Sequence, residues 1–219
     1  SFEWNEDLRR VLVIALPILF GGATMQFYFV IHRIVAAQLE EGVVSAVNFA
    51  SKLTSFPQAI MMTAVTTVIY PMLSKKVSEG AHSEVNRLYK KGLLYLFGLL
   101  VPATAFAYFL AEPLVRLVFA SGNFNQHSLQ LTVPLFKYFA LAMFFLAANT
   151  FITRFYYAKG NSIVPVIFSL LTVFGVNLSV IYMTIDEWGS LSIALGTIVS
   201  SAVNFVLLVL FYEWKLKKL

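Results

Sequence analysis

The chain has 219 residues, of which 59% are hydrophobic and only 12% charged, with a net charge of +5 and no cysteine. An average soluble domain is about 25% charged, so this composition excludes an ordinary soluble domain and indicates that lipid solvates the outer faces. The lack of cysteine excludes disulfides and thiolate metal sites, and the basic residues cluster at the ends of apolar segments rather than as a nucleic-acid-binding patch.

Six apolar segments are each long enough to cross a bilayer core of about 30 Å, which takes roughly 20 helical residues. They cover approximately residues 8–38, 43–73, 90–111, 129–157, 163–184 and 189–213. Because they are continuously apolar and longer than barrel strands of about 10 residues, they predict an all-α polytopic membrane protein with six transmembrane helices. The first two segments exceed the minimum length, and we expect bends at Pro17 and Gly21-Gly22 in the first and at Pro57 in the second.

The charged residues between these segments alternate in sign along the chain. Basic loops stay in the cytoplasm, so the pattern predicts that both chain ends lie on the cytoplasmic side, in agreement with an even number of spans. Residues 74–89 are expected to carry a short amphipathic helix on that surface. The basic residues are Arg9, Arg10, Lys75, Lys76, Arg87, Lys90, Lys91, Arg154, Lys159, Lys215, Lys217 and Lys218, and the acidic residues of the opposite loops are Glu40, Glu41, Asp186 and Glu187.

Lys52 lies well inside the second segment. A lysine near mid-bilayer costs about 2.5–3.5 kcal/mol on insertion scales, so such a residue normally faces a bundle interior or a water-filled cavity. Polar residues precede Lys52 by seven and four positions and follow it by three, which places them on its helix face. They are Ser45, Asn48 and Ser55. We interpret this stripe as the wall of a polar cavity with a fixed cation, which indicates transport of an anionic substrate.

Arg33 and His32 are neighbours near the outer end of the first segment. One interpretation places them at the cavity mouth, with Arg33 as a second cation for the substrate and His32 as a group that couples transport to protons or ions. In the other, Arg33 snorkels to the membrane interface and His32 is a packing residue, which is the commoner use of a lone histidine.

Other polar residues in the segments have ordinary structural uses. Arg154 and Lys137 lie near opposite ends of the fourth segment, where long basic side chains are typical interface anchors. Asn149, Thr150 and Thr153 precede Arg154 on the same segment. Such residues either line a cavity or, more commonly, form hydrogen bonds between helices.

The sequence carries no enzyme signature. It has no glycine-rich phosphate loop, no histidine cluster with metal-ligand spacing and no Ser/His/acid set. The interiors of the segments carry no acidic residue, so neither paired-carboxylate catalysis nor a carboxylate-bound cation is supported. We therefore expect a protein that is not an enzyme, with no cofactor, no metal site and no nucleic-acid partner.

Four short stretches follow one another in an order that resembles a known family. Residues 48–52 read Asn-Phe-Ala-Ser-Lys and are followed by Pro57, and residues 67–74 read Thr-Val-Ile-Tyr-Pro-Met-Leu-Ser. Phe119, Gly122 and Phe124 form the third stretch, and residues 157–162 read Tyr-Ala-Lys-Gly-Asn-Ser, with Pro and Val at 165–166. Together they resemble the MurJ (MviN) family of lipid II flippases, in which an arginine stands at the position of Lys52.

The resemblance covers essentially the whole chain and implies a place within a larger protein. It implies the second six-helix lobe, spans seven to twelve, of a fourteen-span exporter, with the N-terminal lobe as its partner. In the family the two lobes enclose a central cationic cavity for the pyrophosphate and sugar–peptide head of lipid II, and the undecaprenyl tail lies in a groove that the last two helices help to form. We accordingly expect the chain to be an excised or processed piece.

The chain departs from the family pattern where some members bind sodium. The family reads Asp-Arg where this chain has His32-Arg33, and Ile181 stands where a second aspartate would be. Asn177 and Thr197 fit the remaining two positions of the set. Because both carboxylates are gone and neutral oxygens alone would compensate a cation poorly, we predict no sodium site.

The predicted function is therefore that of a lipid II flippase in the bacterial cytoplasmic membrane, which works by alternating access. The predicted substrate site is Lys52 with Arg33, Asn48, Ser45 and Ser55. Three alternatives stay open: an exporter of another undecaprenyl-pyrophosphate-linked saccharide, a multidrug antiporter, and a non-transporting membrane scaffold for cell-wall enzymes. The antiporter usually needs carboxylates inside the membrane, and the scaffold predicts that neutralising Lys52 is harmless.

Overall fold

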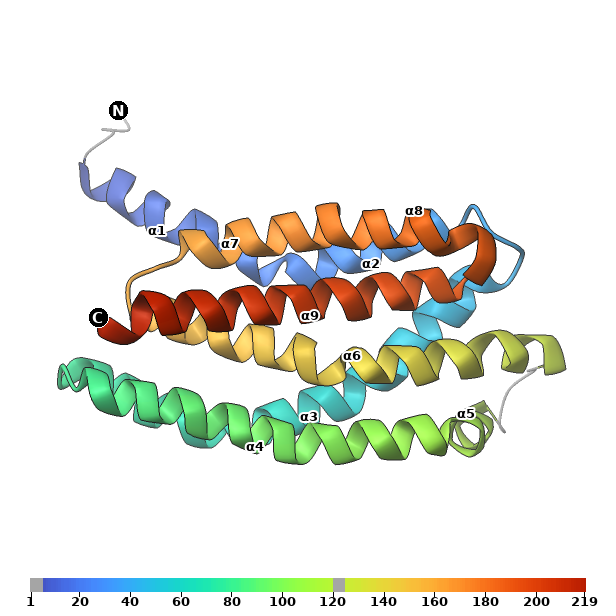
Figure 1. The fold of residues 1–219 in the computed structure, drawn as a ribbon, viewed down its shortest axis with the longest axis horizontal. Coiled ribbons are helices and arrows are strands. Elements are labelled where there is room, and N and C mark those ends of the chain that lie inside the picture. The colour runs from blue at the N-terminus through green and yellow to red at the C-terminus, as the bar shows by residue number, and fades with distance from the viewer. Residues whose placement is uncertain (1–5, 120–124) are drawn as a thin grey trace.

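The computed structural model describes residues 6–119 and 125–219, which fold into helices and turns without a β-strand (Figure 1). Five helices in these ranges are long and apolar enough to cross a membrane, and a sixth span results if the bent pair α1–α2 counts as one. This confirms the prediction of an all-α polytopic membrane protein. The helices are α1 (Glu6–Gly22), α2 (Thr24–Ala36), α3 (Val43–Ser78), α4 (His82–Phe109), α5 (Ala111–Phe119), α6 (Gln126–Ala158), α7 (Ile163–Leu170), η1 (Leu171–Val176), α8 (Asn177–Trp188), α9 (Leu191–Trp214) and η2 (Leu216–Lys218).

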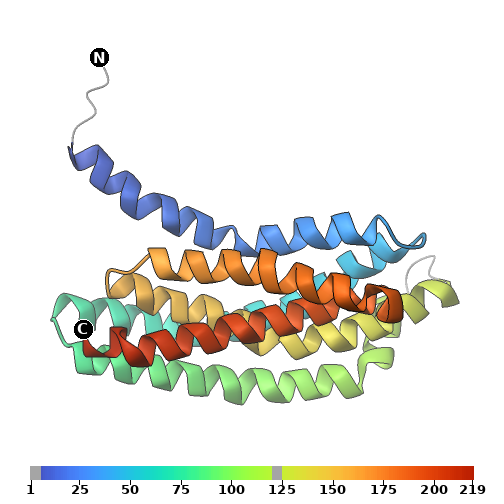
Figure 2. The same ribbon diagram turned by 45° about the horizontal axis from the view of Figure 1, so that its top comes forward.

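The first predicted span is broken into α1 and α2 at Ala23, where the axis bends by 43°. Proline cannot donate a backbone hydrogen bond and glycine holds a helix weakly, so Pro17 and the two glycines before the break account for it. Beyond this bend α1 leans away from the other helices (Figure 2). By contrast, α3 runs as one helix through Pro57 and Pro71.

The prediction of a short amphipathic helix within residues 74–89 is wrong. Instead α3 continues to Ser78 and α4 begins at His82, with Gly80 in the left-handed region (φ +70°) of the tight turn between them. Lys76 forms ion pairs with Glu79 at 3.4 Å and with Glu84 at 3.0 Å, which join the two helix ends. Because 36 residues of helix measure about 54 Å, α3 extends well beyond a bilayer core. The charged residues Lys75 and Lys76 therefore end the apolar segment, but the helix continues through them to Ser78.

A short amphipathic helix is present at the other end of the bundle, as α5. Its Ala111, Val115 and Phe119 are buried, while Glu112 and Arg116 form an exposed ion pair at 2.9 Å. This spacing of four residues places the apolar side chains on the face that packs against the bundle.

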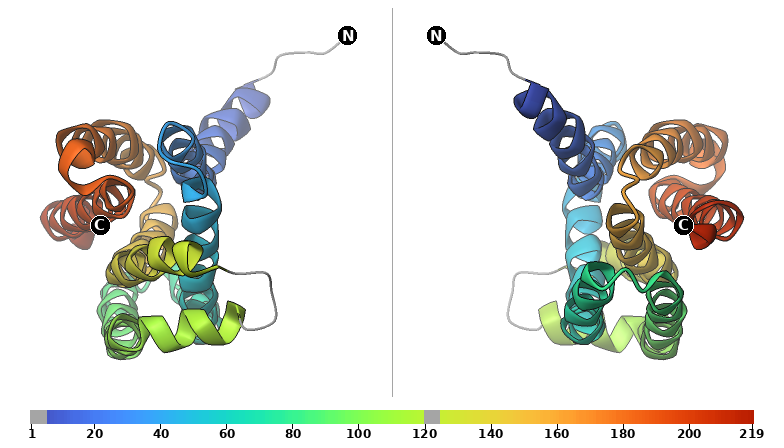
Figure 3. Two further views of the ribbon diagram at one scale, coloured as in Figure 1. Left: turned by 90° about the vertical axis from the view of Figure 1, so that its right-hand side faces the viewer. Right: turned by 90° about the vertical axis from the view of Figure 1, so that its left-hand side faces the viewer.

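The central helix is α6, which packs against α3, α4 and α9. Half of its most apolar 18-residue stretch is buried, against 17% for α3. The end-on views show α7 to α9 on one side of α6 and α3 to α5 on the other (Figure 3). The Tyr156 hydroxyl donates to the Leu208 carbonyl oxygen at 2.5 Å, and the Asn149 amide donates to that of Ser201 at 3.0 Å. These two bonds fix α6 to α9.

The end of the bundle that holds the C-terminus is tied together by polar contacts. The Tyr212 hydroxyl donates to Asn86 Oδ1 at 2.6 Å, and the Asn86 amide donates to the Lys217 carbonyl oxygen at 2.9 Å. Lys159 Nζ donates to the Leu216 carbonyl oxygen at 2.9 Å, and burial lowers the pKa of this lysine. These contacts hold α4, α9 and the α6–α7 connection in one arrangement beside the cavity described below.

Helices α8 and α9 approach closely at Gly196. A Cβ atom built there would overlap the Asn177 side chain and lie 2.9 Å from Ile181 and 3.1 Å from the Asn177 carbonyl oxygen. Backbone cannot give way as a flexible side chain does, so only glycine allows this crossing.

Replacing Gly196 with alanine tests this crossing. Alanine favours a helix over glycine by ~1 kcal/mol, but here the methyl group would force α8 and α9 apart. We expect Gly196→Ala to lower the melting temperature of the purified protein by several degrees. The control is Gly98→Ala, which adds a methyl group to α4 where no atom lies within 4 Å, and it should leave the melting temperature unchanged or raise it. Equal melting temperatures for the two variants would contradict the close crossing.

Candidate functional site

Lys52 lies on an exposed face of α3. In the described part of the chain, no carboxylate lies within ion-pair distance of its ammonium group. Ser45 is exposed as well, whereas Asn48 and Ser55 are half-buried on the flank of the same face. The Ser55 hydroxyl donates to the Ser51 carbonyl oxygen at 2.7 Å. Within the predicted stripe, Lys52 and Ser45 are thus exposed, while Asn48 and Ser55 lie at its border with α2.

The structure brings Arg33 and Asn48 together across α2 and α3, where both line a small cavity that His32 also reaches. The Arg33 side chain is exposed. A second small cavity is lined by His32 and Ser55. Four of the predicted site residues therefore meet along the α2–α3 contact, and Lys52 follows on the outward face of α3.

His32 is 5% exposed and joins α2 to α9, since its Nε2 lies 2.9 Å from the Thr197 hydroxyl. The rings of Tyr28, Phe29 and Phe139 surround it at centroid distances of 6.0, 6.5 and 5.5 Å. Its Nδ1 atom is buried without a hydrogen-bond partner. This environment makes His32 a specific contact between α2 and α9.

The residues at the family's sodium positions do not fit a cation in this chain. Thr197 is engaged with His32, and the Asn177 side chain is buried with both polar atoms unpartnered. Ile181 is fully buried and apolar. Elsewhere in the described ranges, no group of three or more His, Cys, Asp and Glu residues could hold a metal ion. The set offers neutral oxygens only, which compensate a cation poorly.

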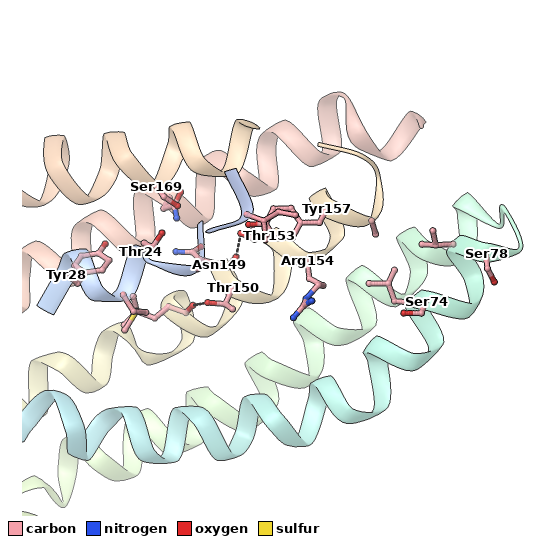
Figure 4. Close-up of a pocket in the computed structure, with 18 residues that line it drawn as sticks. Thr24, Tyr28, Ser74, Ser78, Asn149, Thr150, Thr153, Arg154, Tyr157 and Ser169 are labelled. Atoms are coloured by element: carbon pink, nitrogen blue, oxygen red, sulfur yellow. Dashed lines mark hydrogen bonds between the residues drawn. The ribbon is translucent and has the colours of Figure 1, made fainter. Parts of the chain in front are cut away.

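A further cavity of about 790 Å³ adjoins the small cavity of His32 and Ser55, with which it shares Met25, Tyr28 and Leu146. It is enclosed by α1, α2, the second half of α3 and the second half of α6, with single residues from α7 and α9 (Figure 4). Tyr28 lines it and donates to, or accepts from, the Ser200 hydroxyl at 2.6 Å. Its polar lining residues are Thr24, Tyr28, Ser74, Ser78, Asn149, Thr150, Thr153, Arg154, Tyr157, Ser169 and Asn204.

Arg154 is the charged residue of this lining, which contains no carboxylate. Its guanidinium carbon lies 4.8 Å from the centre of the Tyr70 ring on α3, a cation–π contact. In the described ranges no ion pair involves Arg154. Its assignment as an interface anchor is thus incomplete, because the same side chain forms part of a cavity wall.

Asn149 and Asn204 contribute buried acceptors to the same lining. Each has a side-chain oxygen that is buried without a hydrogen-bond partner, which costs about 1–3 kcal/mol when no ligand or water satisfies it. The sequence left two uses open for Asn149, Thr150 and Thr153: lining a cavity or forming hydrogen bonds between helices. All three line this cavity, and Asn149 also donates a hydrogen bond to α9. Their spacing along one face of α6, just before Arg154, was the sequence signal for this site.

The family-like stretches fall around these sites. Residues 48–52 form the α3 face described above, and Ser74 ends the second stretch inside the cavity. Tyr157 begins the fourth, in which Asn161 Oδ1 accepts from the Val164 backbone at 3.1 Å and starts α7. In the third, Phe119 ends α5, and residues 122 and 124 lie outside the described residues.

Known proteins match the chain along nearly its whole length. A family model described as "Lipid II flippase MurJ" matches residues 1–218. A protein named probable lipid II flippase MurJ from Rhizobium meliloti is 29% identical over 210 residues, and one from Bdellovibrio bacteriovorus is 24% identical over 205. Lipid II flippase MurJ of Burkholderia cenocepacia is 27% identical over 206 residues.

A solved structure titled "Lipid II flippase MurJ, inward closed conformation" has the same fold, with a TM-score of 0.80 at 20% identity over 97% of this chain. The alignments cover 94% to 95% of this chain but only 39% to 40% of those three relatives, and 45% of the solved chain. This chain therefore corresponds to less than half of the proteins that it matches. Since the family model spans almost every residue, the chain belongs to the MurJ family of lipid II flippases.

Proposed function

We propose that the protein containing this chain moves lipid II from the cytoplasmic to the outer leaflet of the bacterial cytoplasmic membrane. The observation that carries the proposal is Lys52, an exposed lysine within a membrane-spanning helix of a chain that belongs to a flippase family. A fixed cation at that depth is costly against lipid but attracts a pyrophosphate. The family match favours lipid II over another lipid-linked saccharide or a drug.

The exposed face of α3 that carries Lys52 must be covered by further protein, because the described helices leave it open. Lys52 and Ser45 are exposed on this face of α3, although Ala50, Ser51 and Thr54 on the opposite side are buried. The relatives extend well beyond the matched region, since the chain covers 39% of two of them. A second lobe, formed by the rest of the protein, would enclose Lys52 in a central cavity, and the described helices would form the C-terminal lobe.

In this cavity the ammonium of Lys52 and the guanidinium of Arg33 attract the pyrophosphate. Ser45, Asn48 and Ser55 provide hydrogen bonds to the head group from the same face. Rocking of one lobe against the other then exposes the cavity to the outer side. No covalent bond is made or broken in this cycle.

His32 is the group for coupling to protons. It holds α2 to α9 through Thr197, so a change in its protonation would act on the helix that carries Arg33. His32 lines two small cavities, and Tyr28 and Arg33 are the other titratable or charged residues among those that line them. Both lie on α2, and the lining residues from α3, α6 and α9 are uncharged.

The orientation follows from the charges at the two ends of the bundle. The α3–α4 turn, the α6–α7 connection and the C-terminus lie at one end (Figure 1), and all three are rich in lysine and arginine. Because such ends remain in the cytoplasm, this end faces the cytoplasm. An inside-negative potential then favours the inward-facing cationic cavity by about 2.3 kcal/mol per charge per 100 mV.

The role of Lys52 is tested by lipid II binding to the intact protein, measured by native mass spectrometry. Loss of one charge-assisted contact is worth about 1.5–3 kcal/mol, so Lys52→Ala should weaken binding at least tenfold. Lys52→Arg should restore it.

The matched control is Lys137→Ala, which removes the same charge from a span where the ammonium lies 4.7 Å from the Tyr108 ring. It should bind lipid II as the wild type does. Equal binding by Lys52→Ala and the wild type would reject the substrate role of Lys52.

The orientation is tested by labelling single cysteines, since the chain contains none. Ser83 is exposed beside the α3–α4 turn and Gln38 is exposed between α2 and α3. With a membrane-impermeant maleimide on spheroplasts, Gln38→Cys should react and Ser83→Cys should react only after lysis. The reverse pattern would place the chain ends outside the cell.

A further inference from the structure

The 790 Å³ cavity is not used by the function proposed above. None of Lys52, Arg33, Asn48, Ser45 and Ser55 lines it. It lies toward the end of the bundle that holds the α3–α4 turn, because Ser74, Ser78 and Tyr157 come from the last turns of α3 and α6 (Figure 4). At its other end the lining meets the small cavity of His32 and Ser55, since Met25, Tyr28 and Leu146 belong to both.

The charge of this cavity suits an anion. Arg154 is its cation, and no aspartate or glutamate is among the lining residues. The Tyr70 ring packs against one side of the guanidinium at 4.8 Å and leaves its N–H groups without a carboxylate partner in the described ranges. A planar guanidinium presents donors that match phosphate oxygens in pairs.

The neutral groups suit a ligand that also carries hydroxyl or amide donors. The side-chain oxygens of Asn149 and Asn204 are buried and unpartnered, and these residues are 9% and 6% exposed. Asn149 already donates its amide to the Ser201 carbonyl oxygen, so its oxygen is left as the acceptor. Both asparagines share the cavity lining with Arg154, and such a set suits a phosphate that is linked to a sugar or another polyol.

The remaining wall is apolar and identifies the ligand as an amphiphile. Ile18, Met25, Leu73, Val77 and Leu146 line this part, with Gly22 at the bend between α1 and α2. A free phosphate or sugar phosphate gains nothing from such a wall, whereas the first carbons of a lipid tail bury apolar surface against it.

We propose that this cavity is a second lipid-binding site, in which Arg154 holds the phosphate-bearing head group of a polyprenyl diphosphate lipid before or after it occupies the Lys52 face. The identity of the lipid rests on the proposed function. The site itself does not, because its cation, its acceptors and its apolar wall are all independent of Lys52.

The test uses the intact protein in detergent and three probes: undecaprenyl diphosphate, inorganic pyrophosphate and undecaprenol. We expect undecaprenyl diphosphate to bind and Arg154→Gln to weaken that binding about tenfold, with partial recovery in Arg154→Lys. Pyrophosphate and undecaprenol should each bind more weakly than the whole lipid. Equal affinity for pyrophosphate would overturn the lipid as ligand, and unchanged binding by Arg154→Gln would overturn the site.

The control for charge is Arg116→Gln, because that arginine is paired with Glu112 at 2.9 Å on α5, and it should bind as the wild type does. A second measurement leaves Arg154 in place and so does not depend on that variant folding. Thr150→Cys lies in the cavity and Thr67→Cys lies on an exposed part of α3. Undecaprenyl diphosphate should slow labelling of the first at least threefold and leave the second unchanged. Equal slowing at both would overturn the proposal.

The two proposals fail separately. If Lys52→Ala transports lipid II normally while Arg154→Gln loses undecaprenyl diphosphate, the cavity is a lipid site and the proposed transport route is wrong. If Lys52→Ala loses lipid II while Arg154→Gln and Thr150→Cys behave as the wild type with and without lipid, the transport route stands and the second site is rejected.

Discussion

A charged side chain within the hydrocarbon layer is stable only against protein or water, and this constraint decides how α3 is used. The helix buries one face against α2, α4 and α6 and places Lys52 on an exposed face. Lipid there would leave the ammonium unpaired. In the proposed function this face borders a water-filled space, which further protein would enclose.

The same constraint explains why the hydrogen bonds between helices converge on α9. In lipid, burial of apolar surface does not drive helices together, so close packing and polar contacts hold them. Residues 197–201 supply these contacts: Thr197 meets His32, Ser200 meets Tyr28, and the Ser201 carbonyl oxygen accepts from Asn149. Both α2 and α6 are fixed to α9 in this way, and the bend that follows at Ala23 directs α1 outward. The 790 Å³ cavity lies between that helix and α2, α3 and α6.

Hydropathy was enough to predict the spanning helices, because a spanning segment must satisfy its backbone internally. It was not enough for helix ends, since the charged residues after Leu73 end the apolar segment while α3 runs on to Ser78. Sequence patterns also could not predict which side chains contact one another in the folded chain. His32 meets a threonine 165 positions away, and the same arginine near a span end either anchors at the interface or lines a cavity, depending on which helices surround it. The Arg154 side chain is exposed and also lines a cavity, and only the packing of α3 against α6 shows the second feature.

Distance along α3 relates the two cationic positions. Tyr70, which packs on Arg154, follows Lys52 by 18 residues, or about 27 Å of helix, which approaches the roughly 30 Å thickness of a bilayer core. A pyrophosphate is far shorter than this, so one pyrophosphate cannot contact both cations at once. If both bind the same lipid, they are successive positions on one path, with Arg154 nearer the basic end of the bundle. Transfer between them then moves the negative charge about 27 Å along α3, and the lack of a carboxylate in the lining around Arg154 means that no fixed anion opposes that movement at its start.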